Sequence, residues 1–252
     1  MNIFRGGAIP NSYPALYLTE HKALVVADLH IGYESALKAK GICLPHASYV
    51  YMRKIIAELI RQTGAESIIF LGDLKHEFGK PSAQEWVEVR DLLESVLGSG
   101  VSVHAVRGNH DNYILSILGR YNVQLHDPWM LIGDIVLLHG DKDVELPKGA
   151  KIMIMGHEHP AVSSVDVSGS RYKFKCFLIG RMAGIRVIVL PALSPLSSGV
   201  GINETPKEEL LSPILRRVDI DSFTPIAVEQ DVGIFRFPQI GFMRSRTTGI
   251  PG

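Results

Sequence analysis

Five short apolar runs, each ending abruptly beside polar residues, constrain the fold of this chain more than any other feature. Their length, their β-branched residues and their usual endings at Gly or Asp are typical of strands buried in a sheet. The runs cover residues 23–27, 67–71, 101–106, 135–138 and 151–155. Two later runs, Tyr172 to Ile179 and Arg186 to Leu190, have the same character. The sequence therefore predicts a fold built on buried strands.

Helical patterns separate the early strands. One apolar face with a 3.6-residue period runs from Tyr49 to Ile60. A second helix is predicted to begin after Ser82, because Ser82 and Glu85 have the spacing of a capping box, and the "GSG" at 98–100 is expected to end it. Alternation of strand and helix favours a sheet covered by helices.

The second half of the chain has a different pattern. From about Val123 onward the strands follow one another with short turns, including a hairpin at Ile132 to Ile135, which favours a second, mixed or antiparallel sheet packed on the first. We predict one domain over residues 1–252, with a motif-bearing core at 23–202 and C-terminal strands with a short basic tail at 203–252. The tail "RSRTTGIPG" is expected to be mobile.

Composition and charge exclude several classes of protein. Lys plus Arg and Asp plus Glu each number 26, so the overall charge gives no argument for a nucleic-acid or membrane partner. Cys43 and Cys176 lie in apolar stretches and are predicted to be reduced thiols of an intracellular protein. The N-terminus lacks the pattern of a signal peptide, and the apolar runs are too short to span a bilayer. We expect a cytoplasmic protein.

Candidate ligands for metal ions follow all five strands. In a sheet, ligands gather at the carboxyl ends of the strands, so these groups converge if the five ends share one side. Imidazole with carboxylate suits Mn, Fe, Zn or Ni, and the lack of a thiolate argues against a structural zinc site. The residues are Asp28 and His30, Asp73 and His76, Asn109 to Asp111, His139 and Asp141, and His157 and His159.

The number of these ligands exceeds what one ion needs. Two ions about 3.5–4 Å apart share a bridging carboxylate and serve phosphoester or amide hydrolysis. Asp73, in the middle of the series, is the natural bridge. Taken singly, each residue has a simpler explanation, such as a helix cap for Asp28 or a turn for Asn109. Ser194, Ser197 and Ser198 lie in a loop that could reach the site, but turn chemistry is the preferred explanation for them. Together, however, the five groups would require five coincidences in a fixed order.

The order and spacing of these groups resemble those of a known family. The motifs "DLH", "GDLKH", "GNHD", "HG" and "GHEH", from Asp28 to His159, resemble the five signature motifs of the calcineurin-like metallophosphoesterases. The His76 form of the second motif is similar to that of SbcD-type DNA repair nucleases and bacterial DNA-ligase-associated phosphoesterases. The segment "VLPALSPLSSGVGIN" is similar to a loop of the latter group and of its ICC-like archaeal relatives.

This resemblance implies a fold and a pair of metal sites. The fold is an α/β four-layer αββα sandwich with two central mixed sheets and metals at the strand ends. Two divalent ions are implied, with Mn expected and Fe, Zn, Ni or Mg as alternatives. The implied ligands are Asp28, His30 and His159 for the first ion, Asn109, His139 and His157 for the second, and Asp73 as the bridge.

The resemblance also implies roles in catalysis. A hydroxide held between the ions would attack phosphorus. His110 would bind the phosphoryl group and protonate the leaving oxygen, and Asp111 would orient His110. Arg107 would stabilise phosphoryl charge, and Asp141 would hold an imidazole. His76 is expected to contact the substrate or a ligand rather than a metal.

The function implied is that of a phosphoric ester hydrolase acting on phosphodiesters. Candidate substrates are DNA or RNA ends, which would link the chain to DNA repair and to a repair-protein partner. A phosphomonoesterase or cyclic-nucleotide phosphodiesterase is the alternative, and a non-catalytic scaffold ranks lower because all seven ligands are present. The chain has no heptad run, so a small stand-alone enzyme is favoured over a large complex. No membrane partner is expected, and the oligomeric state stays open.

Overall fold

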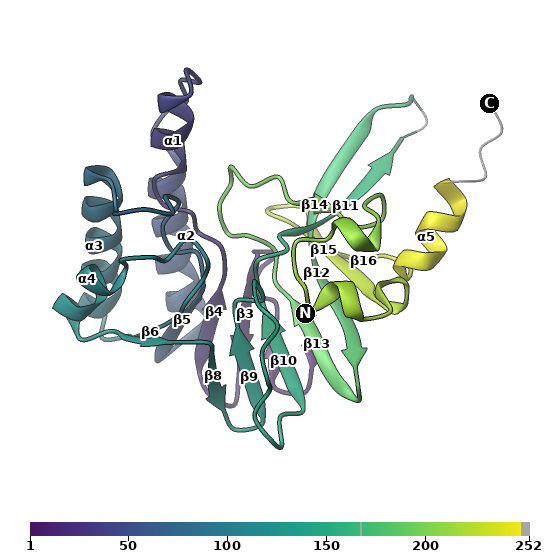
Figure 1. The fold of residues 1–252 in the computed structure, drawn as a ribbon, viewed down its shortest axis with the longest axis horizontal. Helices are drawn as coiled ribbons and strands as arrows, with labels where there is room; N and C mark the ends of the chain where they lie inside the picture. The colour runs from purple at the N-terminus through teal and green to yellow at the C-terminus, as the bar shows by residue number, and fades with distance from the viewer. Residues whose placement is uncertain (167, 248–252) are drawn as a thin grey trace.

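Two β-sheets packed face to face form the centre of the computed structural model, which describes residues 1–166 and 168–247 (Figure 1). The first sheet has seven strands in sequence order, with antiparallel pairing up to β4 and parallel pairing from β4 to β7. Its strands are β1 (Asn2–Phe4), β2 (Gly7–Ala8), β3 (Ala15–Leu18), β4 (Ala23–Val26), β5 (Ser67–Leu71), β6 (Ser102–Val106) and β7 (Gln124–His126).

The second sheet has nine strands and is mixed, because β9, β10 and β13 run parallel while their neighbours are antiparallel. Its main order is β14 (Val200–Gly201), β11 (Pro160–Val165), β12 (Arg171–Met182), β13 (Ile185–Val189), β10 (Ile152–Met155), β9 (Ile135–Leu138) and β8 (Trp129–Ile132). The strand β15 (Thr224–Glu229) pairs with β12 and with β16 (Gly233–Arg236).

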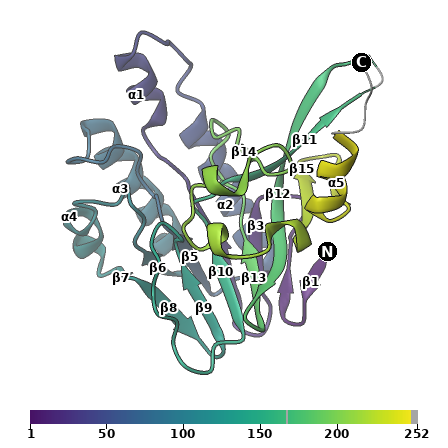
Figure 2. The same ribbon diagram turned by 45° about the vertical axis from the view of Figure 1, so that its right-hand side comes forward.

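Helices cover the outer faces of both sheets (Figures 1 and 2). The first sheet carries α1 (Tyr33–Ala39), α2 (Ser48–Thr63), α3 (Ala83–Gly98), α4 (Leu115–Leu118) and the 3-10 helix η1 (Gly119–Tyr121). The second carries the shorter helices η2 (Lys207–Glu209), η3 (Leu215–Arg217), η4 (Ile220–Ser222) and α5 (Ile240–Thr247). The result is the expected four-layer αββα sandwich.

Alternating side chains along each strand divide the core between the layers. In β5, Phe70 packs under the helices of the first sheet, while Ile69 faces the space between the sheets. In β10, Ile154 fills that same space and Met153 packs under the helices of the second sheet. Successive residues of a strand point to opposite faces, so strands buried on both faces read as unbroken apolar runs.

The capping box at the start of α3 is present as predicted. Ser82 Oγ accepts a hydrogen bond from the Glu85 backbone N–H at 3.2 Å, and Glu85 Oε2 accepts one from the Ser82 N–H at 2.7 Å. The helix ends at Gly98, beside the "GSG" expected to stop it. The predicted hairpin also forms, with Ile132 paired to Ile135.

The boundary between the two sheets differs from the prediction. The strand β7 follows Val123 but pairs in parallel with β6 in the first sheet, and the second sheet begins only at β8. The crossover from β6 to β7 holds the four-residue helix α4. So short a helix has no visible 3.6-residue period, which is why the sequence showed no further alternation of strand and helix at this point.

Two smaller expectations are also wrong. Arg244 and Ser245 of the supposedly mobile tail lie in α5, where Arg244 donates to the carbonyls of Ile202 at 2.9 Å and Thr205 at 2.6 Å. The rest of that tail, residues 248–252, lies outside the described residues. Cys176 is buried as expected, but Cys43 is exposed. Within the described part of the chain, no helix is both long enough and apolar enough to cross a membrane.

Candidate metal centre

All the predicted ligands meet at one edge of the sandwich, where strands of both sheets end. Asp28, Asp73 and Asn109 follow β4, β5 and β6 of the first sheet, while His139 and His157 follow β9 and β10 of the second. The carboxyl ends of parallel strands share one edge of a sheet, and the two edges lie together because the sheets pack face to face. The site therefore spans the boundary between the sheets.

The first group of ligands contains Asp28, His30 and His159. Their candidate ligand atoms all lie within 4.8 Å of one another. His159 Nε2 is 3.3 Å from Asp28 Oδ1 and 3.3 Å from His30 Nε2. This is the set that the resemblance implies for the first ion, and one carboxylate with two imidazoles suits a divalent transition metal.

The second group contains Asp73, His139 and His157, again with ligand atoms within 4.8 Å of one another. His139 Nε2 lies 3.3 Å from Asp73 Oδ2 and 3.1 Å from Asn109 Oδ1, which adds the amide oxygen to this group. Asp73 Oδ2 is also 3.8 Å from His30 Nε2 of the first group. The carboxylate of Asp73 thus lies between the two groups, where a bridging ligand is needed.

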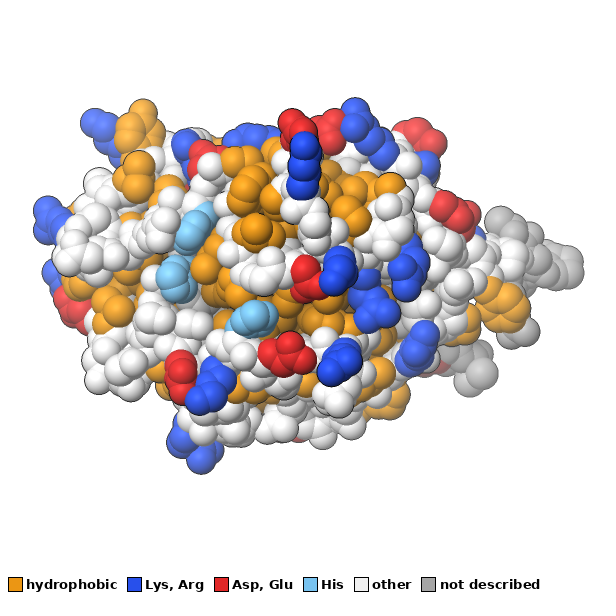
Figure 3. All heavy atoms as spheres, turned by 90° about the horizontal axis from the view of Figure 1, so that it is seen from below, with side chains coloured by type: hydrophobic (Ala, Val, Ile, Leu, Met, Phe, Trp, Pro, Cys, Tyr) orange, Lys and Arg blue, Asp and Glu red, His pale blue; other side chains and the backbone are white. Residues whose placement is uncertain are grey.

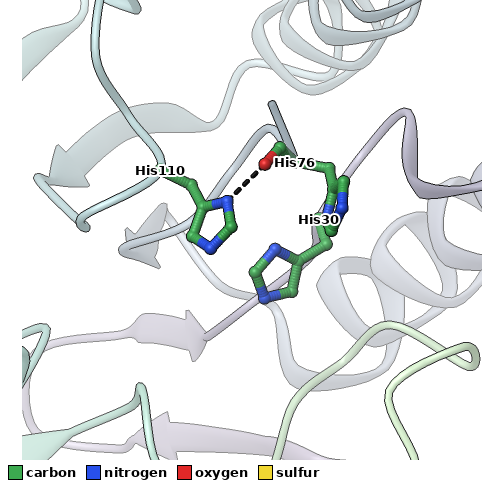
Figure 4. Close-up of side chains that lie close together, drawn as sticks. All are labelled: His30, His76 and His110. Carbon is green, nitrogen blue, oxygen red and sulfur yellow. Dashed lines mark hydrogen bonds between the residues drawn. The ribbon is translucent and has the colours of Figure 1, made fainter. Parts of the chain in front are cut away.

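A third group joins His30 to His76 and His110, and Figure 4 shows how the three rings lie. His110 donates from Nδ1 to the carbonyl of His76, and its Nε2 lies 3.9 Å from Asp73 Oδ2. The imidazole of His110 stacks on Phe78 with ring centroids 3.7 Å apart, and that of His76 stacks on Tyr33 at 4.1 Å. Stacking on Phe78 and Tyr33 thereby fixes the orientation of both imidazoles.

Burial and the carboxylates of Asp28 and Asp73 shift the pKa values of the imidazoles in the two ligand groups. Burial lowers the pKa of His30 to about 3 and that of His157 to about 4. Burial also opposes a charge on His139, but the carboxylates of Asp73 and Asp28 outweigh it and raise the pKa of His139 to about 10. Neutral imidazole is the metal-binding form, so a cation bound here would displace the proton of His139.

The backbone is strained at most of the predicted ligands. A left-handed conformation is uncommon for residues other than glycine, and each residue held in it costs about 1–3 kcal/mol. Five of the seven predicted ligands have a positive φ between 47° and 67°, namely Asp28, His30, Asp73, His157 and His159. Strain concentrated on these residues is the mark of a functional site.

The glycines beside the ligands leave room for them. A Cβ on Gly72 would lie 2.1 Å from His139 Nδ1, and φ at Gly72 is 80°. A Cβ on Gly108 would lie 2.2 Å from Asp73 Oδ1 and 2.4 Å from the Asp73 backbone nitrogen. The motifs "GD" and "GN" therefore need glycine because the ligands of neighbouring strands pack directly against its backbone.

Asp111 acts on the site through the backbone. Its carboxylate is buried and accepts hydrogen bonds from the N–H groups of Leu74 and Gly108, both at 3.0 Å. The imidazole of His110 contacts the carbonyl of His76 instead. The expectation that Asp111 orients that imidazole directly is therefore corrected: Asp111 joins the second and third motif loops.

Two other predicted contributors lie at the margin. Arg107 donates to Asp127 Oδ2 and Asn112 Oδ1, both at 3.1 Å, so its guanidinium is held by protein partners. Asp141 pairs with Lys142 at 3.8 Å, and its charge is a minor contribution that raises the pKa of His139.

Two buried charged residues hold the loops of the site, and the sequence analysis assigned neither of them this role. Lys75 is fully buried and donates to the carbonyls of His110 at 2.6 Å, Gly79 at 3.1 Å and Glu77. Glu85 accepts from the N–H groups of His76 at 2.9 Å and Glu77 at 2.7 Å. The capping-box spacing did single out Glu85, but only as a helix cap, and nothing in the sequence marks Lys75 as buried.

Ser197 belongs to a turn, as predicted, because its N–H donates to the Ser194 carbonyl at 3.3 Å, and its side chain also reaches the site. Its hydroxyl lies 2.7 Å from Nδ1 of His159, a contact that fixes the orientation of the ring and leaves Nε2 for a metal. Ser197 also lines a cavity of about 340 Å³ over the centre, together with His30, His76 and His110.

Replacing Ser197 by Ala is expected to weaken the binding of one of two metal ions about 10–100-fold, as loss of a hydrogen bond to a metal-binding His does elsewhere. Calorimetric titration of manganese into chelated protein measures both affinities. Ser116→Ala is the matched control, because Ser116 is exposed in α4 and its hydroxyl donates to the carbonyl of Tyr113 at 2.7 Å. Unchanged affinity for both ions in Ser197→Ala would contradict the role of this hydroxyl.

Comparisons with known proteins agree with this geometry. The sequence profile of the calcineurin-like phosphoesterase family matches residues 21–221. The solved structure of the Pseudomonas putida nuclease MPE is 21% identical, covers 86% of this chain and 89% of its own, and has a TM-score of 0.61, which shows the same fold. The phosphoesterase Yfce from E. coli is 18% identical, with coverage of 86% and 98% and a TM-score of 0.42. A sequence search of curated proteins gave no match.

Proposed function

Since the chain belongs to the calcineurin-like phosphoesterase family, we propose that it is a dinuclear-metal-dependent enzyme that hydrolyses phosphodiester bonds. The observation that carries this proposal is the place of Asp73. Its Oδ2 lies 3.3 Å from His139 Nε2 of one ligand group and 3.8 Å from His30 Nε2 of the other. A carboxylate shared between two such groups is the requirement for a pair of ions that acts on phosphoesters.

Two sets of residues, with one shared carboxylate, would hold the two metal ions. Asp28, His30 and His159 would hold one ion, Asn109, His139 and His157 the other, and Asp73 both. When bound, two divalent ions at such a site activate water and neutralise the charge of the phosphoryl group. Both ions are proposed to be manganese, because imidazole and carboxylate ligands suit it.

His110 is proposed to be the proton donor to the leaving oxygen. Because Nδ1 donates to the carbonyl of His76, the proton available for transfer is the one on Nε2. That nitrogen lies 3.9 Å from Asp73 Oδ2, and the ring lines the cavity over the metal centre. A positioned acid of this kind contributes about 10²–10⁴-fold to the rate.

Nucleic acid is the proposed source of the phosphodiester. The Pseudomonas putida protein of similar fold is named a nuclease, which supports this choice over a phosphomonoester or a cyclic nucleotide. The same proposal has three further parts. The enzyme would process nucleic-acid ends in repair, it would be located in the cytoplasm, and its chain would form a single domain.

Chelation tests the reaction. Protein treated with a chelator is expected to lose hydrolysis of bis-p-nitrophenyl phosphate, and manganese is expected to restore it, because the ligands alone supply no nucleophile. The turnover of p-nitrophenyl phosphate by the same preparation separates diester from monoester activity. Circular dichroism of the chelated protein controls for unfolding. Full activity after complete removal of metal would refute the proposal.

A further inference from the structure

A second cavity lies beside the metal centre, on the other side of a short loop. It measures about 290 Å³, close to the lower end of the volumes usual for small-molecule sites, ~300 Å³. Ser197 and Ser198 line both this cavity and the one over the metals, so the two share a wall. The two cavities are therefore immediate neighbours in the structure.

Two ammonium groups line the second cavity. Lys173 and Lys175 come from β12 and, two residues apart, point to the same face of the sheet. Lys175 donates to the carbonyls of Ala192 at 2.8 Å and Ser194, and Lys173 donates to that of Gly199 at 3.1 Å. Carbonyl oxygens are neutral, so these bonds fix the side chains without cancelling their charge.

The charge of the cavity is positive. An ammonium has three N–H donors, so each lysine has donors beyond the carbonyl bonds just described. Burial lowers the pKa of Lys175 to about 8, at which the side chain is still mainly protonated at neutral pH. One carboxylate, that of Glu229, also lines the cavity, so its lining carries an excess of one positive charge.

An aromatic ring also lines the second cavity. Tyr51 of α2 is 39% exposed, and its hydroxyl donates to Gln230 Oε1 at 2.5 Å, which ties the ring to the turn after β15. A fixed, exposed ring beside positive charge is the combination that single-stranded nucleic acids use, with bases on the ring and phosphates on the cations.

We propose that this cavity binds a second phosphate of the substrate, next along the strand from the phosphate at the metal centre, through Lys173, Lys175 and the Ser198 hydroxyl. The inference rests on the proposed function and narrows it, because a substrate with a single phosphate cannot fill both cavities. The second phosphate is either an internal diester or a terminal monoester, since both present the same anionic oxygens.

The test compares substrates with one and two phosphates. With manganese present, kcat/KM is measured for dTpdT, which has one phosphate, and for dTpdTpdT and pdTpdT, which have two. The quantity compared between variants is the preference for two phosphates, which is the ratio of kcat/KM for a two-phosphate substrate to kcat/KM for dTpdT. Lys173→Met is expected to lower that preference about tenfold through KM, the loss of one charge-assisted hydrogen bond. A loss with pdTpdT alone would assign the site to a terminal phosphate, and a loss with dTpdTpdT to an internal one.

The control substitution is made outside both cavities. Figure 3 shows Lys and Arg side chains gathered on the side of the molecule seen from below. Lys151, Arg181 and Arg186 line a separate hollow. Lys151→Met removes the same charge from this patch and is expected to keep the preference.

An equal loss for all three substrates in Lys173→Met, or an unchanged preference, would overturn the inference while leaving the phosphoesterase intact. Failure of the unsubstituted protein to cleave any of the three, or bis-p-nitrophenyl phosphate, would overturn the proposed function and the inference with it.

Discussion

Asp73→Asn is expected to reduce phosphodiester hydrolysis below detection and to leave fewer than two manganese ions bound per chain. Asp73 Oδ1 accepts from the His110 N–H at 2.9 Å, and an amide oxygen can keep this bond. The amide NH₂ would then take the place of Oδ2, which faces His139 Nε2 at 3.3 Å and His30 Nε2 at 3.8 Å. A donor would thus replace the negative oxygen that two cations need.

Metal content by elemental analysis and turnover of bis-p-nitrophenyl phosphate check this result. Asp134→Asn is the matched control, because Asp134 forms only a surface pair with Lys151 at 3.2 Å and such pairs contribute little to stability. Two bound ions and normal turnover in Asp73→Asn would show that Asp73 is not the bridge.

Gly108→Ala is expected to disable the site through a single methyl group. The new Cβ would lie 2.2 Å from Asp73 Oδ1 and 2.4 Å from the Asp73 backbone nitrogen, so the side chain of Asp73 cannot simply turn away. Overpacking of this kind costs about 1–3 kcal/mol. The melting temperature should fall by roughly 2–4 °C per kcal/mol for a chain of this size, and metal binding and turnover should fall with it.

Gly98→Ala provides the comparison, because a Cβ on Gly98 meets no atom within 4 Å. Thermal melting and manganese titration of both variants separate crowding at the site from a general effect of alanine. If Gly108→Ala melts and binds metal like Gly98→Ala, the packing of the second and third motifs is looser than described.

The sequence predicted the strands that lead to the site because each is short, apolar on both faces and ended by its motif. β5 and β9 have the predicted bounds, Ser67–Leu71 and Ile135–Leu138. The same order of motifs led to the family and to the two ligand groups. The roles of the individual ligands and of His110 stay predictions until metal binding is measured.

Other features depend on contacts that no local pattern announces. Ser197 reaches His159 across 38 residues, and a serine in a Pro- and Ser-rich loop looks the same whether or not it does so. Lysine is a residue type that is mostly exposed, yet Lys75 is buried and donates to loop carbonyls. The strands β1 and β2, of three and two residues, lack the length at which a period of two can be recognised.

The position of the ligands on both sheets has a consequence for how the chain acquires its metals. His30 and His159 are 129 residues apart, so an ion held by both would close a loop of about half the chain. In a chain-entropy estimate, a cross-link over such a loop restricts the unfolded state by about 5 kcal/mol. An ion at this site would then also link the two sheets of the protein. A chain still lacking its second sheet would carry Asp28, His30, Asp73 and Asn109 but no complete set of predicted ligands, so metal binding would report that folding is complete.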